Sequence, residues 1–118
     1  ISIGLVGSEM CIRDSTSIFT YSNQRELIDI LNELNGQLTF SIFGTKEKDG
    51  SIIDQLICLG TQKAGRIIFN DLPTGVEVSS AMQHGGPYPA SSDSRYTAVG
   101  TDSIARFQRS VTFQDLRI

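Results

Sequence analysis

The sequence has few of the residues that metal centres and disulfide frameworks require. Its 118 residues include one histidine, His84, and two cysteines, Cys11 and Cys58. A single histidine among scattered carboxylates shows no metal-ligand spacing, so we expect no metal site. Two cysteines, of which Cys11 falls in an atypical N-terminal stretch, build no disulfide framework, and a cytoplasmic location is the default expectation.

Long apolar runs and an excess of positive charge are also absent. No run approaches the ~20 apolar residues that a membrane-spanning helix needs. Ten basic residues stand against thirteen acidic ones, a net charge of −3, whereas nucleic-acid binding requires clustered Lys and Arg. We therefore expect neither a membrane nor a nucleic acid as a partner.

The N-terminal stretch does not resemble a folded segment. Residues 5–15, LVGSEMCIRDS, look like the in-frame translation of a sequencing-library adaptor, and the chain starts at Ile1 rather than Met. The rival interpretation, a signal peptide, would need an apolar region where Arg13 and Asp14 stand. We therefore expect residues 1–15 to be a non-native leader and residues 16–118 to carry the fold. Without the leader, nine basic residues remain against eleven acidic ones, a net charge of about −2.

The hydrophobic pattern of the rest predicts alternating strands and helices. The clearest element is an amphipathic helix over residues 24–34, with Asn23 as its cap and Glu26 three positions later in a capping-box arrangement. Cys58 falls on the apolar face of a second predicted helix, where it is expected to be a buried structural thiol. The predicted order is strand 17–21, helix 24–34, strand 38–43, charged turn 45–50, helix 51–59 or 51–62, strand 66–70, a short helix from Asp102 and a last strand 111–113.

This order is typical of an α/β protein with a small, mostly parallel sheet, two main helices and a long loop, because parallel strands need helical crossovers. The loop, residues 70–93, holds all three prolines and the only histidine. Pro73 forbids a regular element there, and Gly85 and Gly86 supply backbone freedom. An ordered loop of this length is usually a binding or active-site loop. It leaves the carboxyl end of a strand at Asn70, where open α/β sheets place their ligand crevices.

Residues of the loop allow more than one interpretation. His84 is either a hydrogen-bonded structural residue or a substrate contact. Gly85 and Gly86 could cradle a phosphate, but no helix-opening glycine pattern supports that. Glu77 is either a solvent-facing acid or a partly buried acid in a pocket, the former being commoner.

Three runs of sequence resemble one known family. They are AGRIIFNDLPTGVEV (residues 64–78), AMQHGGPYPASSDSR (81–95) and VGTDSIARFQRSVTFQD (99–115). They look like the C-terminal end of an aldehyde dehydrogenase catalytic domain, and the subgroup they resemble is the α-ketoglutaric semialdehyde (2,5-dioxovalerate) dehydrogenases. The resemblance covers residues 17–118, so residues 16–118 are expected to be a C-terminal fragment of the catalytic and oligomerisation region.

The resemblance implies oxidation of an aldehyde to an acid with NAD or NADP. In the family a cysteine thiolate attacks the aldehyde and a glutamate activates the water that hydrolyses the thioester. By the resemblance these residues and the cofactor-binding domain lie upstream, so the fragment alone is expected to be inactive and to bind no cofactor. Residues 111–114 would join an oligomerisation sheet of a homo-oligomer. The positions expected to line the tunnel of the small aldehyde substrate are Asn70, Pro73, Thr74, Val76, His84 and Gly85.

Two other functions are compatible with an α/β chain of this size. One is a free-standing interaction module, without catalysis, that binds a partner through its loop and an exposed strand edge. The other, a small independent hydrolase, lacks a nucleophile–base pair in the sequence.

Overall fold

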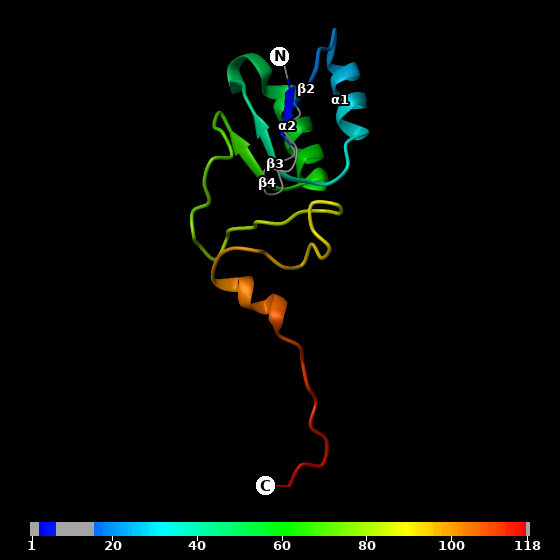
Figure 1. Ribbon diagram of the computed structural model, residues 1–118. Helices are drawn as coiled ribbons and strands as arrows, with labels where there is room; N and C mark the ends of the chain where they lie inside the picture. Colours follow the sequence, from blue (N-terminus) through cyan, green and yellow to red (C-terminus); the bar gives the residue numbers. More distant parts are fainter. Residues whose placement is uncertain (1–2, 7–15, 118) are drawn as a thin grey trace.

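A β–α–β unit forms the centre of the protein in the computed structural model, which describes residues 3–6 and 16–117 (Figure 1). Strand β3 (Gln37–Ile42) leads into helix α2 (Lys46–Lys63), and α2 leads into strand β4 (Ala64–Phe69). The two strands pair in parallel, with Gln37 opposite Ala64 and Ile42 opposite Phe69. The predicted α/β class, with a small parallel sheet, two main helices and a long loop, is confirmed.

Helix α1 (Gln24–Asn32) begins at the predicted capping box. Asn23 Oδ1 accepts a hydrogen bond from the Glu26 amide at 3.0 Å, and Glu26 Oε2 accepts one from the Ser22 amide at 2.7 Å. These bonds satisfy amides that have no partner within the helix. The helix ends two residues before the predicted boundary at 34, within the range over which helix ends fray.

Helix α2 begins five residues earlier than the predicted start at 51. Residues 45–50, expected to be a charged turn, form its cap and first turn. Glu47 and Asp49 place negative charge at the positive end of the helix dipole, and Asp49 Oδ2 accepts a hydrogen bond from the Thr45 amide at 3.1 Å. These interactions outweigh the low helix propensity of Gly50.

Helix α2 packs on one face of the β3–β4 pair, α1 packs against α2, and the core lies among them. Phe40 and Ile42 project from β3 into this layer. The prediction that Cys58 is buried is wrong, because its side chain is exposed. Each helical residue advances about 100° around the axis, so Cys58 lies to one side of the buried stripe. The buried apolar residues are Leu27, Leu31, Phe40, Ile42, Ile52, Ile53, Leu59 and Ala64.

The strand predicted at residues 17–21 is observed as β2 (Thr16–Phe19), but it does not join the parallel sheet. It pairs antiparallel with β1 (Ile3–Val6) in a separate two-stranded sheet. Strand β1 falls within the expected 1–15 leader, so that part of the stretch has regular backbone pairing. The remaining leader residues, 1–2 and 7–15, lie outside the described residues.

The C-terminal residues extend away from the α/β unit (Figure 1). The predicted short helix is a 3₁₀ helix, η1 (Thr101–Phe107). The predicted strand 111–113 is wrong, because residues 108–117 contain no strand. The side chains of Val111 and Phe113 are 55% and 74% exposed, so their strand-like alternation finds no neighbouring strand in the described part of the chain.

Lys63, the last residue of α2, stabilises the end of α1. Its Nζ donates hydrogen bonds to the carbonyl oxygens of Asn32 at 2.7 Å and Leu34 at 2.8 Å. The carbonyls at a helix C-terminus have no partner within the helix and carry partial negative charge. A single ammonium group therefore joins the ends of the two helices.

Replacing Lys63 by Met should lower the free energy of unfolding by about 1–3 kcal/mol, since hydrogen bonds to a charged group are lost while the aliphatic stem is retained. Urea unfolding followed by circular dichroism measures this. Lys48→Met is the matched control, because Lys48 is exposed on the same helix. An equal loss of stability in both variants would contradict the role of Lys63.

Candidate functional site

Asn70 lies at the carboxyl end of β4, as predicted. Its amide donates a hydrogen bond to Ile42 O at 2.8 Å, which extends the parallel ladder one step beyond the last strand pair. Its side chain binds both polar groups of Gly44: Oδ1 accepts from Gly44 N at 2.9 Å and Nδ2 donates to Gly44 O at 3.0 Å. Asn70 therefore ties the end of β4 to the turn that follows β3.

A hollow of about 420 Å³ lies at this end of the sheet. The turn between β3 and α2 forms one side of it, and α2 and the end of β4 form the others. Its lining combines polar groups of the turn with apolar side chains. This is the position at which open α/β sheets bind ligands. The lining residues are Gly44, Thr45, Lys46, Ile53, Ile57, Phe69 and Asn70.

The first part of the loop, residues 71–82, is largely exposed. Pro73 and Thr74 are exposed, and Val76 is half-buried. Arg66 Nη1 donates a hydrogen bond to Gly75 O at 2.7 Å, which holds the loop beside β4. Glu77 is exposed, so the solvent-facing interpretation of this acid is confirmed.

The second part of the loop returns to the opposite end of the sheet. Gly85 and Gly86 are buried against the first residues of β3 and β4, and the Gly36 amide donates a hydrogen bond to Tyr88 O at 3.3 Å. Figure 1 shows this segment, drawn in yellow, beneath the starts of both strands. Six-residue strands are about 20 Å long, so His84 and Gly85 lie about that far from Asn70.

His84 is held in place through its backbone. Its amide donates a hydrogen bond to the hydroxyl of Thr97 at 2.9 Å, and its carbonyl accepts one from Ala98 N at 2.9 Å. The Thr97 hydroxyl also donates to Val99 O at 2.7 Å, and Thr97 is 6% exposed. Thr97 was not among the predicted site residues, because a lone threonine after a loop gives no signal that would identify it.

Gly85 and Gly86 serve close backbone packing in the structure. A Cβ on Gly86 would collide with the Gln37 carbonyl oxygen, and a Cβ on Gly65 would collide with the Gly85 carbonyl oxygen. Backbone of the loop therefore occupies the space that a bound phosphate would need. Packing explains this glycine pair better than a phosphate cradle does.

The predicted site residues thus form two groups. Asn70 lines the hollow at the carboxyl ends of the strands, and Pro73, Thr74 and Val76 follow it on the exposed part of the loop. His84 and Gly85 lie at the amino ends. The analysis of the sequence also missed Gly44, Thr45 and Lys46, which could have been found from their position between a predicted strand and helix.

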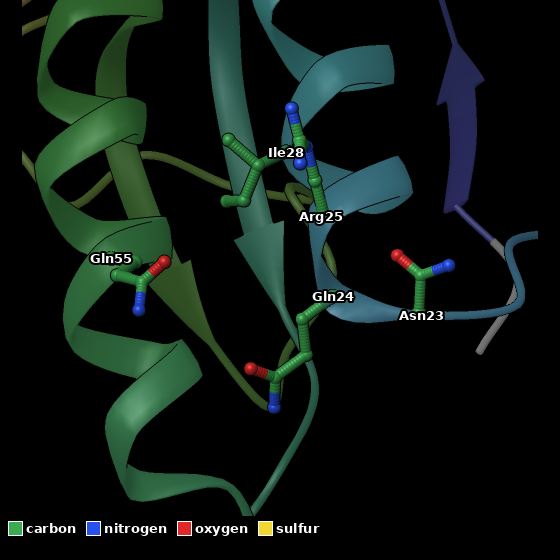
Figure 2. A pocket seen from close by; sticks show the side chains of 5 residues that line it. All are labelled: Asn23, Gln24, Arg25, Ile28 and Gln55. Atoms are coloured by element: carbon green, nitrogen blue, oxygen red, sulfur yellow. The ribbon is translucent and has the colours of Figure 1, made fainter.

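A second hollow, of about 600 Å³, lies between the start of α1 and the middle of α2. Figure 2 shows Gln24 and Gln55 facing it from the two helices, with Asn23 and Arg25 at its edge. Ile28 supplies the apolar part of the lining. Asn23 Oδ1 already accepts the capping hydrogen bond of α1, and no predicted site residue lies here.

The described residues contain one ion pair, between Arg95 and Asp93 at 2.6 Å. Hydrogen bonds from the Arg95 side chain and backbone lower the pKa of Asp93 from 3.8 to about 2. The same pairing raises the pKa of Arg95. The Arg95 guanidinium also lies 5.4 Å from the centre of the Tyr96 ring. Because the Arg95 side chain is 76% exposed, this pair adds little to stability.

Within residues 3–6 and 16–117, no group of three or more His, Cys, Asp or Glu side chains is placed to hold a metal ion. No helix of the same residues combines the length and the apolar character that crossing a membrane requires.

Two curated proteins share extensive sequence with this chain. One, from Acinetobacter baylyi, is named alpha-ketoglutaric semialdehyde dehydrogenase and is 49% identical over 98 residues, which is 83% of this chain and 18% of that protein. The other, alpha-ketoglutaric semialdehyde dehydrogenase 2 from Azospirillum brasilense, is 43% identical over 90 residues, or 76% of this chain and 17% of that protein. No family model matches the sequence.

The chain belongs to the aldehyde dehydrogenase family. It spans less than a fifth of the length of these two relatives. The resemblance expected from residues 64–115 is thereby confirmed. In this aldehyde dehydrogenase segment, the β3–α2–β4 unit supports a loop with one end at the hollow and the other beneath the strands.

Substituting Ala for Gly65 should lower the free energy of unfolding by about 1–3 kcal/mol, because the added methyl group must push the Gly85 backbone away from β4. Thermal melting measures the change. Gly50→Ala is the control: its Cβ meets nothing within 4 Å, and it lies within α2, so stability should rise by up to about 1 kcal/mol. A neutral Gly65→Ala variant would refute the close packing.

Proposed function

We propose that this chain is part of an NAD- or NADP-dependent aldehyde dehydrogenase that oxidises a semialdehyde, such as α-ketoglutaric semialdehyde, to the acid. The observation that carries this is the 49% identity over 98 residues to a protein named for that activity. In the intact enzyme this segment contributes residues of the substrate tunnel and contacts between subunits. We also propose a cytoplasmic location, since the lone cysteine outside the expected leader suits a compartment without disulfides.

The catalytic thiolate and the water-activating glutamate belong to another part of the enzyme. Cys58 supports this division of roles, because it is exposed on α2 and is not among the residues that line the hollow. The dinucleotide is also bound elsewhere. Gly85 and Gly86 offer no phosphate cradle, since the backbone of β3 and β4 fills the space beside them.

The tunnel wall at this end of the protein comprises Asn70 and the loop after it. Asn70 lines the hollow, and Thr74 and Val76 lie on the segment that Arg66 holds beside β4. His84 and Gly85 lie outside this wall, at the amino ends of the strands, where they support the return of the loop.

The face of the β3–β4 pair away from the helices is covered only in part, by the loop that Arg66 holds, and is a surface for the rest of the enzyme. Parallel sheets are covered on both faces in most proteins, whereas α2 here packs on one face. Ser41 Oγ and Arg66 Nε are buried on the other face without a hydrogen-bond partner among the described residues. Another segment of the intact enzyme packs on this face beside the loop.

The proposed activity can be tested by extending the reading frame upstream in the source DNA. The longer product should form NADH or NADPH from α-ketoglutaric semialdehyde, while the 118-residue chain should form none. Absorbance of the reduced nicotinamide measures both. An upstream frame without a cysteine-containing dehydrogenase, or a start codon close to Ser17, would favour the free-standing interaction module.

We also propose that the C-terminal segment joins two copies of the protein. Phe107 is 87% exposed, and Val111, Phe113 and Leu116 are each more than half exposed. A run of exposed apolar side chains on an extended segment is typical of an interface. Residues 111–114 have the alternation of a strand and therefore pair with a strand of a second subunit.

The double variant Phe107→Ser with Phe113→Ser should weaken self-association by at least about a hundredfold, since burying each ring contributes about 1.5–3 kcal/mol. Sedimentation velocity over a range of concentrations measures the change. Thr112→Ala, with Gln114→Ala, is the control in the same segment. Wild-type protein that stays monomeric at every concentration would contradict the proposed interface.

A further inference from the structure

The side chain of Asn70 makes two hydrogen bonds to the backbone of Gly44, one as acceptor and one as donor. Oδ1 accepts from Gly44 N at 2.9 Å, and Nδ2 donates to Gly44 O at 3.0 Å. The Asn70 amide adds a third bond, to Ile42 O at 2.8 Å. The side chain thus makes the pair of hydrogen bonds that one further residue of β4 would make. Its partner is Gly44, which lies beyond the end of β3.

These bonds fix the orientation of the Asn70 amide. Flipping it would place Nδ2 against the Gly44 amide and Oδ1 against the Gly44 carbonyl, two donors facing and two acceptors facing. One N–H and one lone pair of the side chain are used in this way. A bound molecule that required the opposite orientation would have to break both bonds.

The backbone of Asn70 has an uncommon conformation at this contact. Its φ is +50°, in the left-handed region that glycine adopts with the least strain and that asparagine tolerates. Glycine would adopt this φ with less strain but at a larger entropy cost on folding. What asparagine adds is its pair of hydrogen bonds to Gly44.

Gly44 is held from its other side by α2. A Cβ on Gly44 would lie 3.1 Å from Asp49 Oδ2 and 3.6 Å from Ile53 Cδ1. Asp49 Oδ2 also accepts the hydrogen bond from the Thr45 amide. Residues 44–46 are therefore fixed between Asn70 and the first turn of α2, and these three residues form the polar side of the hollow of about 420 Å³.

From this arrangement we infer that Asn70 is a positioning residue: it acts on the substrate through Gly44, by setting the position of residues 44–46 at the edge of the hollow. The inference rests on the proposed function, because it assigns this hollow to the substrate path. The contact with substrate comes from the turn and from the apolar lining of Ile53, Ile57 and Phe69.

The pair of hydrogen bonds between Asn70 and Gly44, here called the clamp, is tested in the 118-residue chain by hydrogen exchange. In Asn70→Gly, which keeps the backbone geometry and removes the side chain, the Gly44 amide should exchange about tenfold faster, as expected for loss of one hydrogen bond. Asn70→Asp retains the acceptor for Gly44 N but places a carboxylate oxygen against Gly44 O, so it should also speed the exchange of the Gly44 amide. The amides of Phe40 and Ile67 within the strands report on overall stability. Unchanged Gly44 exchange in Asn70→Gly would overturn the inference.

Its consequence for substrate is tested in the longer, active reading frame. Asn70→Gly should raise KM about tenfold and leave kcat within about twofold, because the ground-state contact is displaced while the reacting groups lie elsewhere. Lys63→Met is the control: it should lower stability without changing KM, since Lys63 lies at the far end of α2.

The outcomes of the two experiments separate the inference from the proposed function. A wild-type frame that oxidises no aldehyde removes the proposed function and the substrate role of Asn70 with it, while the exchange rates still decide whether the clamp exists. An active frame in which Asn70→Gly leaves KM unchanged overturns the positioning role alone. A raised KM in Asn70→Gly with an unchanged KM in Lys63→Met supports it.

Discussion

The parallel pairing of β3 with β4 is the constraint on which the rest of the structure depends. Two parallel strands need a crossover, and α2 supplies it. The crossover places both carboxyl ends and the start of α2 at one end of the sheet, and both amino ends at the other. The loop that follows β4 therefore begins at the hollow. It reaches the amino ends of the strands only by running back along their length.

Local signals in the sequence were sufficient for the elements that local chemistry determines. Asn23 and Glu26 predicted the start of α1 because the capping box is built from residues three apart. The crossover followed from the alternation of apolar runs. The start of α2 was missed because the charged residues 45–50 were taken as a turn, whereas Glu47 and Asp49 stabilise the first turn of the helix. Cys58 was misplaced because a stripe of consecutive isoleucines and leucines leaves the exact face of a helix undetermined.

Features that depend on distant partners could not be predicted. Residues 111–113 have the pattern of a strand, but a strand forms only where a second strand is available. Strand β2 was expected beside the other strands and pairs instead with β1. In both cases the sequence has the strand propensity expected of a β-strand, but propensity does not determine which strand it pairs with. The family resemblance supplied the identity of the segment, which no periodicity could have done.

The candidate site shows the same division between local and distant information. Asn70 was predicted to lie at the carboxyl end of a strand, and it does, because strand direction alone determines that position. His84 was grouped with it because the loop was treated as one wall. The backbone contacts of Gly65 and Gly86 decide otherwise, since only residues without a Cβ let the loop lie against the starts of the strands. Gly85 and Gly86 suggested a binding loop, but in the structure they serve backbone packing at the starts of β3 and β4. Because backbone fills the space beside these glycines, this half of the loop has no room for a ligand there.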